Sequence, residues 1–197
     1  MKTAIRKSLV LVVLFLATTL SYGNEISSNT NNRKDETTNV TFKNVTKGSV
    51  VLIKDNNGLI LYKELIKKNG TYTKGFDLTA LPNGDYYFEL NKDVEIIEIP
   101  LKVEESVVTF DKTGEVKFFK PVVWLNKDRV FISKFSIEDE ILEIEILSDS
   151  NERILLEKVK RKGNILGKIY DFSTSEKGTY TIIVKSNGRR FVNHVQI

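Results

Sequence analysis

Few side chains in this chain could carry catalysis, and the first to consider is its single histidine, His194. A serine nucleophile needs a base within hydrogen-bond reach, and no serine near His194 lies in a nucleophile-elbow sequence. The acidic run Glu138-Asp139-Glu140 could supply paired carboxylates for glycoside hydrolysis. Contiguous residues do not flank a sugar from two sides, so we interpret this run as a solvated loop. The sequence therefore predicts a protein that is not an enzyme and has no catalytic residue.

Metal and cofactor sites are not expected either. One histidine and no cysteine cannot complete a zinc coordination sphere. The turn Asp55-Asn56-Asn57-Gly58 is rich in oxygen, but a calcium loop needs about six to eight oxygen ligands. We interpret it as a hairpin turn, because Asn and Gly tolerate the left-handed backbone region. Neither a phosphate-binding loop nor a dinucleotide fingerprint is present, so no metal and no cofactor are predicted.

Two aromatic residues are candidates for a binding surface. Trp124 follows the pair Phe118-Phe119. We favour an inward or inter-domain position for it, with a platform for a stacked ligand as the alternative. Tyr87 alternates with its neighbours in Tyr86-Tyr87-Phe88, so its side chain should face the opposite way and lie on the surface.

The first residues have the pattern of an export signal. A positively charged start precedes an apolar run from Leu9 to Leu20, and Ser21-Tyr22-Gly23 then supplies small residues for cleavage between Gly23 and Asn24. The apolar run is shorter than the roughly 20 residues that a membrane-spanning helix needs. We therefore predict a signal peptide over 1–23, no transmembrane segment in the mature form, and a periplasmic, secreted or cell-surface location.

The charge balance excludes one class of partner. Three of the 30 Lys and Arg residues lie in the predicted signal, so the rest of the chain has 27 basic and 26 acidic residues. A nearly neutral chain has no electrostatic reason to bind nucleic acid. The absence of cysteine also excludes disulfides, so an exported domain must be held together by its core alone.

The elements that position all these residues are expected to be strands. Residues 24–39 are polar and rich in Asn, Thr and Ser, which predicts a disordered leader. After them, short apolar runs alternate with Asn, Gly, Asp and Lys clusters at strand spacing. The first seven expected strands are 40–45, 50–54, 59–66, 72–78, 85–90, 95–103 and 107–110. The second seven are 122–125, 130–135, 142–147, 154–159, 166–172, 179–184 and 190–197.

An internal repeat organises these strands. Residues 50–91 align without a gap on residues 144–185, and nine of the 42 positions are identical. The apolar and turn positions stay in phase along the whole stretch, although a slip of one residue would reverse every side chain of a strand. We predict an all-β protein of two tandem immunoglobulin-like antiparallel β-sandwiches, over 40–119 and 120–197. An open barrel is the alternative architecture.

Some repeated residues are expected to have structural roles. Gly84 and Tyr86 in the first copy correspond to Gly178 and Tyr180 in the second. A glycine at a turn followed by a tyrosine at the start of a strand is similar to the tyrosine corner of Greek-key sandwiches, in which the phenol bonds back to the main chain. The alternative is a tyrosine on a half-buried strand. Asp77 in the first copy and Asp171 in the second form a further identical pair for which we expect a structural role.

These residues carry a family resemblance. The Asp55-Asn56-Asn57-Gly58 turn and the run Leu81-Pro82-Asn83-Gly84-Asp85-Tyr86 resemble the immunoglobulin-like C-terminal sorting domains of proteins exported by the type IX pathway of Bacteroidota. The second copy is similar in Gly178–Lys185 and in the basic-then-apolar run Arg189–Val192. It lacks the Asn-Pro with which that family usually opens. The resemblance implies the fold and a Bacteroidota-like origin more than a sorting role.

The expected function follows from the signal, the sandwiches and the missing chemistry. We predict a non-catalytic exported protein that acts as an interaction or structural module of the cell envelope, with an unknown protein or envelope polymer as its partner. Edge strands could accept an extended partner by β-augmentation. One alternative is a secretion-related protein whose second copy acts as a sorting or anchoring domain, and another is an enzyme acting on envelope polymer.

Overall fold

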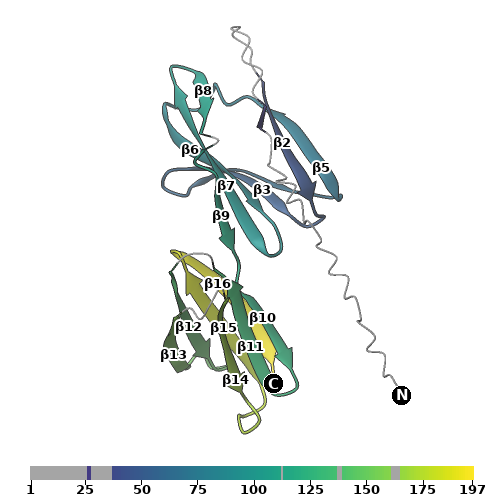
Figure 1. Cartoon of the computed structure of the whole chain (residues 1–197), viewed down its shortest axis with the longest axis vertical. Helices are drawn as coiled ribbons and strands as arrows, with labels where there is room; N and C mark the ends of the chain where they lie inside the picture. The colour runs from purple at the N-terminus through teal and green to yellow at the C-terminus, as the bar shows by residue number, and fades with distance from the viewer. Residues whose placement is uncertain (1–25, 28–36, 112, 137–138, 161–164) are drawn as a thin grey trace, which may run out of the picture.

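The computed structural model of the chain describes residues 26–27, 37–111, 113–136, 139–160 and 165–197. The described residues form strands and turns, and every strand pairing is antiparallel (Figure 1). The prediction of an all-β chain built from antiparallel β-sandwiches is confirmed. The predicted signal peptide and its cleavage site between Gly23 and Asn24 lie outside the described residues. Within the described part of the chain, no helix is long and apolar enough to cross a membrane.

The first sandwich packs a three-stranded sheet against a larger one. The smaller sheet has the order β1-β2-β5, and the larger sheet has the order β4-β3-β6-β7-β8. Strand β9 pairs with the first half of β7. The strands are β1 (Ile26–Ser27), β2 (Thr38–Val45), β3 (Val50–Asp55), β4 (Ile60–Leu65), β5 (Gly70–Phe76), β6 (Gly84–Asn91), β7 (Glu95–Glu104), β8 (Val107–Phe110) and β9 (Val116–Phe119). Their shared core includes Phe42, Phe88 and Leu90, none of which is exposed.

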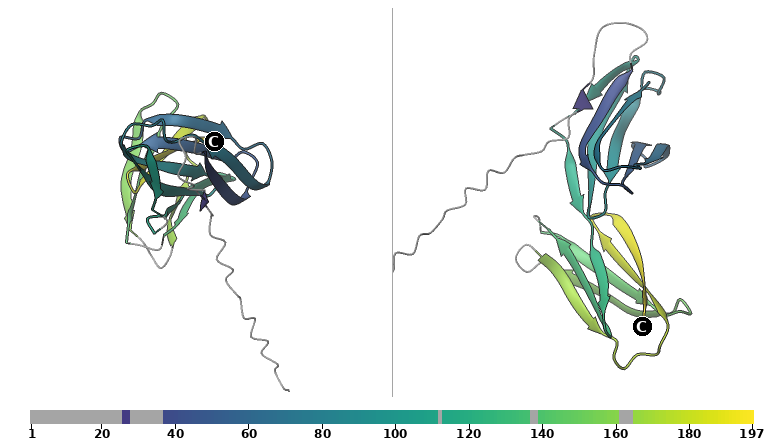
Figure 2. Two further views of the ribbon diagram at one scale, coloured as in Figure 1. Left: turned by 90° about the horizontal axis from the view of Figure 1, so that it is seen from above. Right: turned by 90° about the vertical axis from the view of Figure 1, so that its right-hand side faces the viewer.

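The second sandwich repeats this arrangement. Its sheets have the orders β10-β11-β14 and β13-β12-β15-β16. The strands are β10 (Val122–Asn126), β11 (Arg129–Phe135), β12 (Ile141–Leu147), β13 (Arg153–Lys160), β14 (Ile165–Asp171), β15 (Thr179–Ser186) and β16 (Arg189–Gln196). A separate core forms around Leu142, Ile144 and Ile182. Since β13-β12-β15-β16 corresponds to β4-β3-β6-β7, and β11-β14 to β2-β5, one strand order occurs twice. Figure 2 shows the two sandwiches end to end.

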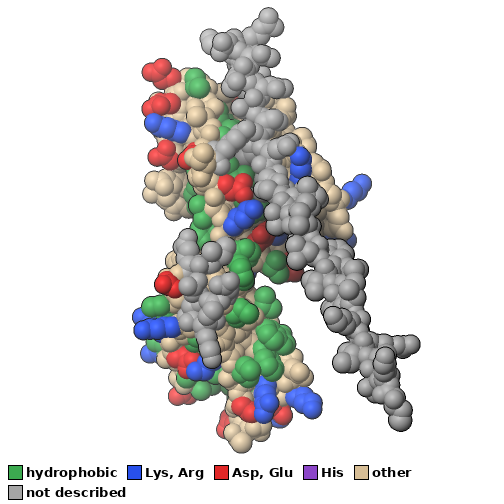
Figure 3. All heavy atoms as spheres, viewed as in Figure 1, with side chains coloured by type: hydrophobic (Ala, Val, Ile, Leu, Met, Phe, Trp, Pro, Cys, Tyr) green, Lys and Arg blue, Asp and Glu red, His purple; other side chains and the backbone are tan. Residues whose placement is uncertain are grey.

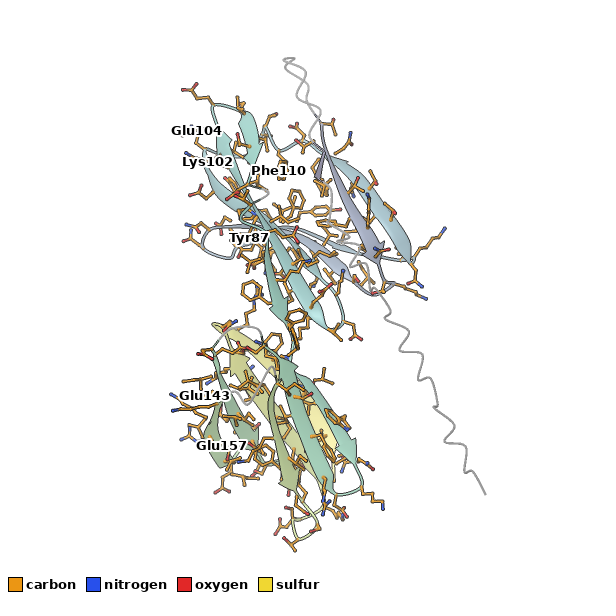
Figure 4. The ribbon with its side chains drawn as sticks, viewed as in Figure 1. Tyr87, Lys102, Glu104, Phe110, Glu143 and Glu157 are labelled. Atoms are coloured by element: carbon orange, nitrogen blue, oxygen red, sulfur yellow. The ribbon has the colours of Figure 1, made fainter. Side chains whose placement is uncertain are left out.

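Alternation along each strand explains why these segments pair as they do. In β12, Leu142, Ile144 and Ile146 are buried between the sheets, whereas the glutamates between them face outward. Fully burying one such aliphatic side chain contributes about 1.5–3 kcal/mol. On the outer face the Glu143 carboxylate lies 2.9 Å from the Lys185 ammonium and 3.9 Å from that of Lys158 (Figure 4). The two faces of the strand therefore have opposite chemistry, apolar towards the core and charged towards solvent.

Three segments differ from the prediction. The range 24–39 was expected to lack structure, but Ile26 and Ser27 pair with Val40 and Asn39, and β2 already begins at Thr38. Such a ladder forms through main-chain groups, so it does not need apolar side chains. Strand β9 was not predicted, because only its pairing with β7 makes the short run Val116–Phe119 a strand.

The third difference concerns the acidic run at 138–140, which was expected to be a solvated loop. The Glu140 carboxylate pairs with the Lys134 ammonium, and their side chains are only 7% and 4% exposed. Ser186 Oγ donates a hydrogen bond of 2.7 Å to the same carboxylate. Burial raises the pKa of Glu140, but the hydrogen bonds from Lys134 and Ser186 outweigh this and hold it below its usual value. Lys134 and Glu140 line a recess together with Phe118 and Phe119 of β9.

Candidate functional site

The outer face of sheet β10-β11-β14 is unusually apolar. Trp124, Phe131 and Ile169 lie side by side across its three strands. The Trp124 and Phe131 rings are stacked, with centroids 5.0 Å apart and planes 11° apart. Trp124 is 43% exposed and Ile169 is 57% exposed. Figure 3 shows a gathering of hydrophobic side chains over β10 and β11 of the lower sandwich. We call this surface, with its neighbours below, the aromatic face.

A row with two small residues separates this row from a second apolar row. Ser133 pairs with Val122 on one side and with Gly167 on the other. Beyond them, Phe135 pairs with Ile165, and both are exposed. Residues two apart on a strand lie about 6.6–6.8 Å apart, so the middle row is about that distance from each of the other two.

A polar lip borders the far side of the aromatic face. Asn126, Arg129 and Asp171 form the next row across the sheet, and the Arg129 Nε donates to the Asp171 carboxylate at 3.2 Å. These residues line an open hollow of about 470 Å³ together with Phe131 and Ser173. Hydrogen bonds from Ser173, and then that from Arg129, lower the pKa of Asp171 to about 2. Charged and amide groups therefore stand next to an aromatic platform.

The fold itself does not require this apolar face. On the equivalent sheet of the first sandwich, Asn39 pairs with Gly75 and Thr41 pairs with Thr73. The two threonine hydroxyls lie 3.1 Å apart in a hydrogen bond. The outer face of an antiparallel sheet is normally polar, because only the inner face joins the core. The second sandwich therefore exposes aromatic and aliphatic side chains on a surface where the first sandwich has polar ones.

The two predicted aromatic candidates lie on different sandwiches. Trp124 lies on the exposed platform and not in the core or between the sandwiches, where we favoured placing it. Tyr87, labelled in Figure 4, is half-buried on the outer side of β6. The Lys54 ammonium is 5.9 Å from its ring centroid. The structure therefore does not bring these two side chains together. Phe131 and Ile169 were not predicted from the sequence. Phe131 lies between the buried residues Val130 and Ile132, and Ile169 precedes Tyr170, which packs against the core. This alternation could have placed both side chains on the outer face.

The repeated glycine and tyrosine residues form equivalent corners. Tyr86 Oη donates to the Pro82 carbonyl at 2.8 Å, and Tyr180 Oη donates to the Glu176 carbonyl at 2.8 Å. Both phenols thus bond to the main chain four residues upstream. Gly84 and Gly178 precede these tyrosines, and neither has a positive φ. The corner geometry therefore depends on the phenol and not on glycine's conformational freedom.

The repeated aspartates also have one role in both copies. Asp77 Oδ1 accepts hydrogen bonds from the Thr79 amide and hydroxyl, at 3.2 and 2.7 Å. Asp171 Oδ1 accepts from the Ser173 amide at 2.9 Å. Each carboxylate fixes the turn that leaves the smaller sheet.

The residues considered for metal and catalysis have ordinary contacts. Asp55 Oδ1 accepts from the Asn57 and Leu59 amides at 2.9 and 2.8 Å, which stabilises a turn with Gly58 at a φ of 83°. His194 Nδ1 lies 3.1 Å from the Thr181 hydroxyl on the neighbouring strand. Across the described ranges, no group of three or more His, Cys, Asp or Glu residues is placed to hold a metal ion.

Comparison with known proteins gives distant structural matches, including the two that follow. No protein-family model and no curated protein matches the chain. The BSP domain of a biofilm associated protein matches with a TM-score of 0.28 and 11% identity, over 81% of this chain and 27% of that one. The FN1–FN3 domains of chicken CNTN1 match with a TM-score of 0.30 and 10% identity, over 80% of this chain and 59% of that one. At this level neither match bears on function, and the repeated strand order is what identifies the fold.

Proposed function

We propose that the chain is an exported, non-catalytic binding protein of the bacterial envelope, with two immunoglobulin-like domains over 40–119 and 120–197. The aromatic face of the second domain holds its ligand. The observation that carries this proposal is the exposed Trp124–Phe131 stack, on a surface whose counterpart in the first sandwich is polar. The separate cores of the two sandwiches support the domain division.

The chemistry of the aromatic face suits an uncharged polysaccharide of the envelope. Flat rings offer an apolar surface to the C–H faces of sugars, and the open hollow beside Phe131 leaves room for further sugar units. The lip supplies an amide, a guanidinium and a carboxylate from Asn126, Arg129 and Asp171, which can donate to and accept from hydroxyl groups. An apolar platform with a few polar groups at its border is a common form of binding site.

The single tryptophan makes this proposal directly testable. Because Trp124 is the only tryptophan, the tryptophan emission of the full chain, excited selectively over tyrosine, reports on the aromatic face alone. We expect the emission to change during titration with uncharged probes, namely chitin oligosaccharides or cello-oligosaccharides. Replacing Phe131→Asn and Ile169→Thr makes the face resemble that of the first sandwich and should remove binding, measured by calorimetry.

The matched control is Val107→Asn, which removes an equally exposed aliphatic side chain from β8 of the first sandwich. This variant should bind as the parent chain does. If the Phe131→Asn/Ile169→Thr variant binds every probe as tightly as the parent, the aromatic face is not the binding site. If no probe binds the parent chain, the ligand is not a polysaccharide of these classes.

The export and sorting expectations need tests in cells. Fractionation of the native cell with N-terminal sequencing checks export and cleavage between Gly23 and Asn24. The sorting role implied by the resemblance is an alternative function of the second domain. A reporter fused to residues 120–197 should reach the surface of a type IX-competent host if that alternative holds, and a reporter retained in the periplasm excludes it.

A further inference from the structure

A second recess lies where the two sandwiches meet. It has a volume of about 470 Å³ and an apolar floor that includes Leu52, Ile96 and Phe191. Five basic side chains line it, and only one acidic side chain, Glu89, does so. The basic residues are Lys54, Lys63, Lys120, Arg189 and Arg190. We call this recess the junction groove.

Internal ion pairs use only part of this positive charge. The Glu89 side chain is 2% exposed and pairs with the Lys54 ammonium at 2.5 Å. It also accepts from Arg189 Nη1 at 3.3 Å. Arg189 Nη2 donates to Glu98 on the neighbouring strand. Two basic groups are thus neutralised by two carboxylates.

The other three basic side chains have no carboxylate partner within the described part of the chain. Lys63 from the first sandwich and Arg190 from the second are both exposed. Among the described residues, the Lys120 ammonium donates to the Lys92 carbonyl, which carries no net charge. Burial lowers the pKa of Lys120, against the weaker opposing effect of the Asp93 and Glu89 carboxylates. A concentration of unpaired positive charge is notable in a chain whose charges otherwise nearly cancel.

One border of the groove is an edge strand with a free side. Strand β4 pairs with β3 and with no other described strand. Its residues Ile60 and Lys63 line the groove, and Leu61 and Leu65 are also exposed. A free edge offers a row of main-chain donors and acceptors to an added strand. The groove therefore combines unpaired cations, an apolar floor and an open hydrogen-bonding edge.

We propose that an extended acidic peptide segment of a partner protein adds to β4 as a further strand, along the border of the junction groove. Alternate side chains of an added strand point to one face, so acidic residues at every second position would lie on the groove side, next to Lys63 and within the field of the other groove cations, Arg190 among them. The main chain of the segment would pair with β4. An acidic polysaccharide could satisfy the charges, but it could not continue the ladder, and the floor is mainly aliphatic and not a flat aromatic platform.

The test uses the full chain and a labelled synthetic peptide of about eight residues in which Asp and Val alternate. Fluorescence anisotropy should show binding that weakens with salt and is about tenfold tighter than that of the matching Lys–Val peptide. The Lys63→Gln/Arg190→Gln variant should weaken binding by about tenfold. The Lys127→Gln/Lys160→Gln variant removes the same charge from exposed sites on the second sandwich, away from β4 and the groove, and should bind as the parent does.

Two further measurements test the occupant and the mode of binding. An Asp-containing peptide of equal charge, in which Pro replaces two of the Val residues, should bind much more weakly, because proline cannot complete the ladder. Equal binding of this peptide would overturn strand addition. Binding of polygalacturonate without binding of the Asp–Val peptide would overturn the peptide proposal. An equal loss in both double variants would show that the groove is not the site. The Phe131→Asn/Ile169→Thr variant should retain peptide binding, so this result is independent of the aromatic face.

Discussion

The Arg189 guanidinium at the start of β16 donates a hydrogen bond to the Glu89 carboxylate on β6, and so links the second sandwich to the first over 3.3 Å. The same guanidinium lies 4.6 Å above the ring centroid of Phe118. Nearby, the Phe119 and Phe135 rings pack edge to face at 4.9 Å. An almost completely buried carboxylate therefore depends on a residue from the other sandwich, which ties the arrangement of the two bodies to one side chain.

Arg189→Met should loosen this arrangement. Glu89 would keep Lys54 and Asn91 but lose Arg189, and a buried charged group that loses a hydrogen bond costs about 1–3 kcal/mol. We expect a lower midpoint in urea unfolding and a broader distribution of distances in small-angle X-ray scattering. Arg190→Met is the matched control, since its neighbouring guanidinium is exposed and unpaired. Unchanged scattering for Arg189→Met would mean that the aromatic contacts alone hold the sandwiches.

Tyr86→Phe and Tyr180→Phe should each destabilise the chain by about 1 kcal/mol. Each substitution removes a phenol that donates to a main-chain carbonyl and leaves the ring in its core. Chemical denaturation measures the change. Tyr87→Phe should have little effect, because its hydroxyl has no such bond. Similar losses at all three positions would contradict a special role for the corner.

The Lys134–Glu140 pair predicts a non-additive result. Lys134→Met leaves the Glu140 carboxylate buried without its cation, and such a change typically costs about 3–5 kcal/mol. The double variant Lys134→Met/Glu140→Leu should recover most of this loss, because it removes both charges together. A double-mutant cycle in urea gives the coupling free energy. Additive effects would mean that Ser186 and its neighbours satisfy Glu140 on their own.

Acid should weaken the first sandwich through Glu64. Its carboxylate accepts hydrogen bonds from Lys74, Tyr62 and Tyr72, and the first two of these bonds lower its pKa most, from 4.5 to about 2. A carboxyl whose pKa is lowered by folding stabilises the native state above the unfolded value. That contribution is therefore complete above about pH 4.5 and is lost as the pH falls towards about 2.

The thermal midpoint of the parent chain should accordingly fall across this range. Glu64→Gln should have a lower midpoint at neutral pH and a flatter dependence below about pH 4.5. Glu104→Gln is the control, because its carboxylate pairs with Lys102 on the open surface. If Glu64→Gln keeps the acid slope of the parent chain, other carboxylates are responsible for it.

Local patterns predicted most of the strands. Leu142, Ile144 and Ile146 repeat at every second position, and this period identifies both a strand and its buried side. The turn at Asp55–Gly58 could be predicted because Asn and Gly tolerate the left-handed region of backbone conformation. By contrast, Val116–Phe119 becomes a strand only through its pairing with β7, which lies about twenty residues earlier. A window of local sequence does not contain that partner.

The two candidate sites were less predictable for a related reason. Alternation could place Phe131 and Ile169 outside, but only the order β10-β11-β14 puts Trp124 beside them. Similarly, Lys63 and Arg190 come from different sandwiches, so their shared groove depends on how the two bodies meet. The chemistry of each side chain was evident from the sequence, whereas its neighbours were not.

The pairing of β9 with β7 determines how the molecule bears tension. Strand β9 runs antiparallel to the first half of β7 and points towards the second sandwich (Figure 1). The Lys120 amide extends this ladder with a bond of 2.9 Å to the Val94 carbonyl. A pull on the second sandwich therefore acts along β9, across hydrogen bonds that lie perpendicular to the strands. These bonds share the load and must yield together, so the connection resists stretching far better than a strand peeled open from one end.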